Sequence, residues 1–126
     1  MTPAATITAL RRHAAGYYAG EAGTELLISH GALLDQPGLS RCIHHTASVT
    51  DGTPLAQIDW DALQQTWHQL PLSGSERRIL HLAASLCAGT SISLSDTLTS
   101  LDDRNLALVT TAIQHAAGRR PPHWLT

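Results

Sequence analysis

The chain contains no phenylalanine and no lysine, and its 126 residues include only two tyrosines, three tryptophans and two cysteines. A β-sandwich requires more aromatic and β-branched residues than this, so the Leu- and Ala-rich composition favours packed helices. The two cysteines, Cys42 and Cys87, are too few for the disulfide framework of a small secreted domain. A net charge of only −2 provides no overall field that would attract nucleic acid or an anionic membrane.

Long apolar stretches are also missing. Arg11 and Arg12 lie where a signal peptide would need its apolar stretch, and the longest uncharged run, residues 79–95, contains a histidine, a glycine and several hydroxyls. We therefore expect a cytoplasmic protein that does not enter a membrane. An apolar content of 43% is sufficient for one packed core. The predicted organisation is a single helical domain over residues 1–118, followed by a Pro-containing segment over residues 119–126.

Capping residues and apolar periodicity predict where the helices lie. The predicted helical segments are residues 3–15, 24–34, 59–70, 73–88, 93–101 and 102–117. Residues 39–58 have the weakest pattern, and we interpret them as a short helix followed by a loop, with a turn at TDGTP. The predicted fold class is all-α, a compact bundle of five to six helices.

The C-terminal part of the bundle has a helix-turn-helix-like layout, because a longer helix, a short one and a final one follow each other from residue 79 onward. In that interpretation Arg104 and Asn105 would contact bases. Asp102 and Asp103 lie at the same end of the last helix and would repel the DNA phosphates. These acids are better explained as an N-cap and a first-turn charge. A DNA-binding transcriptional regulator is therefore the alternative, and the acidic helix start argues against nucleic acid as the partner.

The last helix carries no Asp, Glu or Arg from residue 105 to residue 117, so we expect it to be covered on more than one side. Its apolar spacing predicts that Leu106, Val109, Ile113 and Ala117 point inward. Ala107, Leu108 and Thr111 would then form a small, weakly polar outer surface for a protein partner or a second copy. Trp124 lies beyond two prolines, and it either folds back on the domain or binds elsewhere.

The eight histidines suggest no metal site. The cluster of Cys42, His44 and His45 is one partial half of a zinc site, and no second half has matching spacing. Cys42 beside two histidines could also be an activated thiolate, but nothing supplies an oxyanion hole or an orienting acid. We expect no enzyme activity, no metal and no cofactor. His30 is interpreted as a side chain at the edge of the core, bonded to a backbone carbonyl.

The two tryptophans at residues 60 and 67 share one helical stripe with Leu63 and Leu70. This spacing favours core packing. The alternative is that one tryptophan anchors a partner, because tryptophan is enriched at the energetic centres of interfaces.

The segments ELLISHGALL, IDWDAL, LPLSGSERRILHLAASL, SLSDTLTSLDDRNLALV and QHAAG together resemble short actinobacterial proteins of unassigned function. The resemblance covers most of residues 25–118, and its motifs are capping and core patterns without a catalytic signature. It implies no activity. The prediction from all these observations is a cytoplasmic, non-enzymatic helical module that acts by binding another protein or itself.

Overall fold

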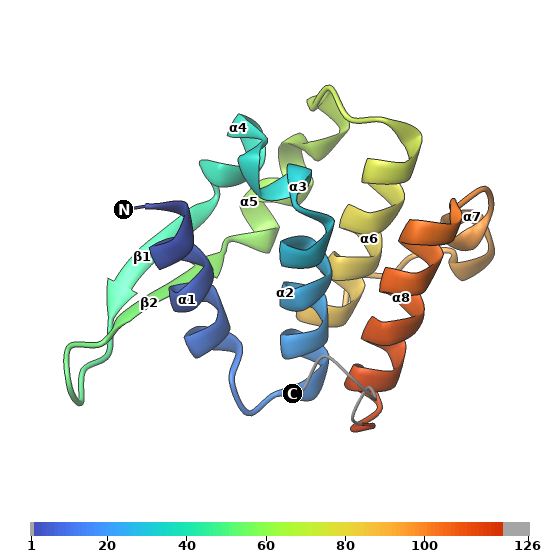
Figure 1. The fold of residues 1–126 in the computed structure, drawn as a ribbon. Helices are drawn as coiled ribbons and strands as arrows, with labels where there is room; N and C mark the ends of the chain where they lie inside the picture. The colour runs from blue at the N-terminus through green and yellow to red at the C-terminus, as the bar shows by residue number, and fades with distance from the viewer. Residues whose placement is uncertain (1, 120–126) are drawn as a thin grey trace.

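The computed structural model describes residues 2–119, in which eight α-helices and one β-hairpin are arranged around the central helix α2 (Figure 1). The helices are α1 (Pro3–Ala14), α2 (Tyr18–His30), α3 (Ala32–Asp35), α4 (Pro37–Ser40), α5 (Trp60–Thr66), α6 (Gly74–Ala88), α7 (Leu94–Leu98) and α8 (Asp103–Ala116). The strands are β1 (Ile43–Ala47) and β2 (Pro54–Ile58), and the short 3-10 helix η1 (Trp67–Gln69) follows α5.

Five of the six predicted helix starts are confirmed by their caps. The helix predicted over residues 24–34 was wrong in its bounds, because α2 already begins at Tyr18 and ends at His30, where Gly31 adopts a positive φ of 90° and separates α2 from α3. The N-cap side chains that accept a backbone N–H bond include those of Thr2, Asp59, Ser73, Ser93 and Asp102. Ser73 and Glu76 form the reciprocal capping box that their spacing predicts, with both bonds present. Gly89 ends α6 in the left-handed conformation, as expected for a C-terminal glycine.

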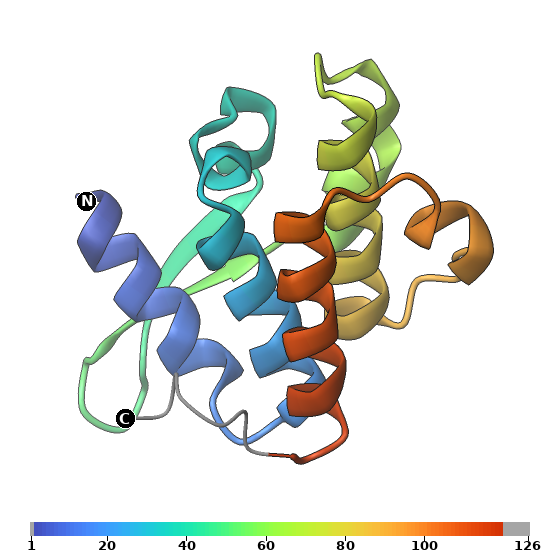
Figure 2. The same cartoon turned by 45° about the vertical axis from the view of Figure 1, so that its right-hand side comes forward.

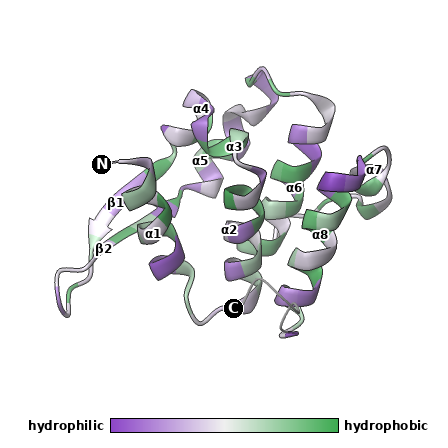
Figure 3. Ribbon diagram, viewed as in Figure 1, coloured by the Kyte–Doolittle hydropathy of each residue, from purple (hydrophilic) through white to green (hydrophobic). Residues whose placement is uncertain are grey.

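The main core lies where α2, α6 and α8 stand side by side (Figure 2). Leu27, Leu80 and Val109, one from each of these helices, are almost completely buried there. Hydrophobic residues recur along the same three helices in Figure 3. A smaller cluster, formed by Ala9, Leu10 and Ala56, joins α1 to the hairpin. Within residues 2–119, no helix combines the length and apolar character that crossing a bilayer requires.

The all-α prediction was wrong for residues 43–58, which form an antiparallel hairpin. Ile43 pairs with Ile58 and Ala47 with Pro54, and the turn is closed by the Ser48 N–H bonding to the Thr53 carbonyl at 2.8 Å. Only Ala56 of the ten strand residues is fully buried. The alternation that identifies a strand is therefore weak here, and the packing of α1 against β2 supplies the missing stabilisation.

The helix count of five to six was too low because the structure adds two single-turn helices, α3 and α4, which are too short to show periodicity. The predicted helix over residues 59–70 also ends early, at Thr66, and continues as η1. In the C-terminal part, α6, α7 and α8 follow each other in the predicted order. Their assignment as a helix-turn-helix stays a prediction.

The orientation of α8 differs from the prediction. Val109 is buried as expected, but Leu106 and Ile113 are 46% and 49% exposed, and Ala117 is exposed as well. Asn105 and Ala112 are buried instead. Because every residue from 105 to 117 is uncharged or a histidine, the sequence contains no polar stripe that would set the rotation of this helix.

The two tryptophans of the stripe at residues 60–70 pack against the main core, as predicted. Trp60 and Trp67 are partly buried there, next to the fully buried Leu63. Trp67 also stacks on His81, with 4.4 Å between the ring centroids.

Candidate functional site: a groove between α1 and α8

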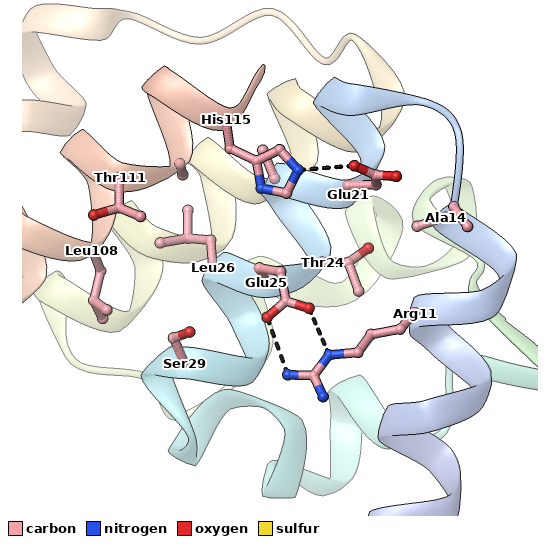
Figure 4. A pocket seen from close by; sticks show the side chains of 13 residues that line it. Arg11, Ala14, Glu21, Thr24, Glu25, Leu26, Ser29, Leu108, Thr111 and His115 are labelled. Carbon is pink, nitrogen blue, oxygen red and sulfur yellow. Dashed lines mark hydrogen bonds and ion pairs between the residues drawn. The ribbon is translucent and has the colours of Figure 1, made fainter. Parts of the chain in front are cut away.

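A groove of about 750 Å³ lies between α1 and α8, and we call it the α1–α8 groove (Figure 4). Its floor is the outer face of α2, and its two walls are α1 and α8. The lining residues are Arg11, Ala14, Ala15, Glu21, Ala22, Thr24, Glu25, Leu26, Ser29, Leu108, Thr111, Ala112 and His115. The groove therefore joins helices from opposite ends of the described part of the chain.

An ion pair crosses the groove from α1 to the floor. Arg11 Nε donates to Glu25 Oε1 at 2.6 Å and Arg11 Nη2 to Glu25 Oε2 at 3.1 Å, which is the two-pronged geometry of a strong arginine–carboxylate contact. The hydrogen bond to Glu25 raises the pKa of Arg11. The arginine side chain is 52% exposed, so solvent screening weakens the pair.

A second polar bridge joins the floor to α8. His115 Nε2 lies 2.8 Å from Glu21 Oε1, and the backbone N–H of Gly16 donates to Glu21 Oε2 at 2.8 Å. The Gly16 bond and then the His115 bond lower the pKa of Glu21. Glu21 is therefore ionised at neutral pH and holds both the turn after α1 and the end of α8.

Beside these two bridges, toward α8, part of the lining is apolar. Leu26 and Ala112 are buried at the bottom, and Leu108 is half-buried in the α8 wall. Figure 4 shows the side chains of Leu26, Leu108 and Thr111 on the same side of the groove, with the Arg11–Glu25 pair opposite. This arrangement suits a ligand that places an apolar side chain against Leu26 and Leu108 and a cation near the two glutamates.

The structure distributes the predicted partner-binding residues over different places. Leu108 and Thr111 both line the groove, so the structure brings these two residues together. Ala107 is exposed and is not among the lining residues. Trp124 lies outside the described residues.

Of the two residues predicted for the DNA-binding alternative, Arg104 is exposed but bonded to α2, and Asn105 is buried. Arg104 Nη2 donates to the carbonyls of Ser29 and His30 at 3.0 and 3.1 Å, and it thereby caps the C-terminal end of α2. The side chain of Asn105 is buried, and its Oδ1 makes no hydrogen bond with the part of the chain that the structure describes. Neither observation supports the reading of DNA bases by these residues, and DNA binding stays an alternative prediction.

The cluster of Cys42, His44 and His45 lies at the start of the hairpin. Cys42 Sγ donates to the Gly38 carbonyl at 3.6 Å, and burial raises the pKa of its thiol above the ordinary value. His44 lines a smaller pocket of about 340 Å³, where its Nε2 is 3.9 Å from Asp59 Oδ2. No three metal-ligating side chains come together within residues 2–119.

The His30 side chain was predicted to bond to a backbone carbonyl, but its buried Nδ1 atom makes no hydrogen bond with the described residues. It is the His30 backbone carbonyl that is bonded, as an acceptor from Arg104. Burial, and then the charge of Arg104, lowers the pKa of this histidine.

Arg11, Glu21 and Glu25 line the groove but were not predicted from the sequence as members of a site. The two glutamates are four residues apart, so they share one face of α2, and that spacing was a usable signal for a polar face. Their pairing with α1 and α8 had no such signal, because it depends on how three helices pack.

The chain matches no protein-family model, and no curated protein or solved structure is significantly similar to it. The chemistry of the groove therefore carries the functional interpretation.

Proposed function

We propose that this protein is a non-enzymatic interaction module that binds a peptide segment of another protein in the α1–α8 groove. The observation that supports the proposal is the combination of an apolar strip, formed by Leu26, Leu108 and Ala112, with the two carboxylates of Glu21 and Glu25 on the same floor. Peptide grooves commonly combine an apolar strip with a few fixed polar groups.

The charges of the groove indicate the composition of the peptide. Its two carboxylates are partnered by Arg11 and His115, both of which come from the walls. The lining contains two glutamates and one arginine, so its carboxylates outnumber its arginines. We therefore propose a peptide with one large apolar side chain and a nearby arginine or lysine, which would compete with the wall residues for the glutamates.

A displayed random-peptide library tests this proposal. Selection on the purified parent protein is expected to enrich peptides that combine an aromatic or long aliphatic residue with a cation. Thr111→Arg fills the groove wall and should weaken their binding about tenfold or more. Gln114→Arg adds the same charge to the exposed outer side of α8, away from the groove lining, and should leave binding unchanged.

A second matched pair separates the two sides of α8 more strictly. Leu108→Asp places a charge in the groove and should abolish peptide binding, whereas Leu106→Asp places one on an exposed position outside the groove lining. Circular dichroism establishes which variants remain folded. Peptides that bind the folded Leu108→Asp and Thr111→Arg proteins as tightly as the parent would exclude the groove as the binding site.

Self-association was predicted through the surface around Leu108, which lies in the groove, and the exposed stripe of α8 lies elsewhere on the helix. Leu106, Thr110, Ile113 and Ala117 recur at helical spacing and are exposed. We propose this stripe as the contact if a homo-oligomer forms, and sedimentation of the parent and of Leu106→Asp measures it.

The DNA-binding regulator remains the second candidate, and only the order of α6, α7 and α8 favours it. An anisotropy titration with duplex DNA tests it. We expect negligible binding at physiological salt, and a sub-micromolar affinity with a steep salt dependence would reverse this ranking.

A further inference from the structure

The end of α8 turns the chain back at one end of the groove. Gly118 is in the left-handed conformation, its N–H donates to the His115 carbonyl at 2.9 Å, and the Arg119 N–H donates to the Gln114 carbonyl at 2.8 Å. These two bonds make a Schellman motif, which stops the helix and changes the direction of the chain. A Cβ on Gly118 would be 3.3 Å from the ring of Tyr18, so the turn lies against the first residue of α2.

The next residues in the sequence are RPPHWLT, residues 120–126, which lie outside the described part. Two consecutive prolines exclude a continuation of α8 and favour an extended chain of about 3.1 Å per residue. Five such steps from Arg119 to Trp124 span about 15 Å. Along α8, seven residues separate His115 from Leu108, a distance of about 10 Å. Trp124 is therefore within reach of the apolar strip.

The composition of this segment matches the ligand chemistry of the groove. It contains two arginines, Arg119 and Arg120, and two large apolar side chains, Trp124 and Leu125, of which Trp124 is the larger. A tryptophan buries about 150–250 Å² when it binds. A groove of about 750 Å³ has room for that side chain and the extended backbone that carries it.

We propose that residues 119–126 are the groove's own ligand, with Trp124 packed between Leu26 and Leu108. The inference rests on the proposed function in that it uses the same groove and the same peptide chemistry. Its consequence is autoinhibition. A segment attached next to the groove acts at an effective concentration of the order of millimolar, so a partner peptide must displace it.

Fluorine NMR on the full chain tests where Trp124 lies. Incorporated 5-fluorotryptophan reports each tryptophan, and Trp124→Phe identifies the signal of residue 124. We expect that signal to differ from the signal of the synthetic peptide of residues 119–126 in solution. Thr111→Arg should move it to the free-peptide position, and Gln114→Arg should leave it unchanged. A parent signal that already coincides with the free peptide overturns the inference.

Dilution separates binding within one chain from binding between two copies. The Trp124 signal should be independent of protein concentration, because the segment and the groove belong to the same chain. A shift that disappears on dilution would assign the groove to the segment of a second copy and overturn the proposal as stated.

A binding measurement separates this inference from the proposed function. The probe is the fluorescein-labelled peptide of residues 119–126, titrated into the full-length parent and into full-length Trp124→Ala. We expect about tenfold tighter binding to Trp124→Ala, because its own segment no longer competes. Equal binding to the two proteins, or no binding to Trp124→Ala, overturns the autoinhibition. The library peptides test the groove as a site independently: if they bind the parent and Trp124→Ala equally, the proposed function stands without the autoinhibition.

Discussion

The two faces of α2 are packed in opposite ways. Gly23 brings α2 so close to α6 that a Cβ at this position would lie 2.4 Å from Cys87 Sγ and 3.0 Å from the Ala83 carbonyl oxygen. Glu25 lies about 200° further around the helix, where an ion pair connects α2 to α1 across an open groove. A glycine on one face of α2 therefore allows close packing against α6, whereas a glutamate on the opposite face lies beside an open groove.

The largest expected effect comes from a substitution in the closely packed core around α2. Leu27 is 1% exposed in the main core, and Leu27→Ala should lower the free energy of unfolding by about 2–5 kcal/mol through lost transfer energy and a cavity. Leu108→Ala, in the half-buried groove wall, should cost roughly 1 kcal/mol or less. Urea denaturation of both variants measures the difference. Equal losses would mean that the groove wall is packed as tightly as the core.

A smaller effect concerns the glycine that permits the close approach. Gly23→Ala gains about 1 kcal/mol of helix propensity but forces its Cβ into Cys87, an overpacking that costs about 1–3 kcal/mol. We expect a net loss of stability. In a protein that already carries Cys87→Ala, the same substitution should cost less or become stabilising. Thermal unfolding of the four proteins of this cycle tests it, and a loss unaffected by Cys87→Ala would assign the clash to the backbone of α6.

A still smaller effect is expected for the ion pair on the open side. A double-mutant cycle of Arg11→Ala and Glu25→Ala should give a coupling of about 0.2–1 kcal/mol, because the arginine is half-exposed. The coupling should decrease at high salt. A coupling several times larger, insensitive to salt, would show that the groove is closed to water around this pair.

Two histidines of α2 and α6 and the groove residue Glu21 are expected to affect the stability of the protein over different pH ranges. Burial lowers the pKa values of His30 and His81 below the ordinary 6.5, so the unfolded chain takes up protons first and stability should fall as the pH drops below about 6.5. The Gly16 and His115 bonds lower the pKa of Glu21 below 4.5, so its contribution is present above that pH and is lost below it.

Substitutions of the titrating residues show which of them causes the loss of stability in each pH range. In denaturant titrations at fixed pH, the double substitution of His30 and His81 by glutamine should reduce the loss in the upper range only. Glu21→Gln should reduce the loss in the lower range only. A single transition that neither variant alters would contradict this assignment.

Much of the helical architecture was predictable because its signals are local. Helix starts at Asp59, Ser73 and Asp102 need only a side-chain oxygen within three residues of a backbone N–H, and that relation is readable from neighbouring letters. The Trp60–Leu70 stripe was equally readable, since a repeat near 3.6 residues places its members on one face.

The hairpin was not predictable in the same way, because β1 has four exposed residues and its stability comes from β2 and α1. The candidate site depends still more on contacts between distant segments. Leu108 and Thr111 could be chosen from the uncharged run of the last helix, but their neighbours Arg11 and Glu25 could not.

By itself, the sequence determined where five of the helices begin, that they pack through aliphatic side chains, and that the last helix carries no Asp, Glu or Arg beyond Arg104. Only the tertiary structure decided which side of α8 faces the core. A helix with a broad uncharged surface has several rotations of similar apolar burial, and its contacts with α2 and α6 select the one that buries Asn105, Val109 and Ala112. That selection leaves Leu106 exposed and places Leu108 in the groove.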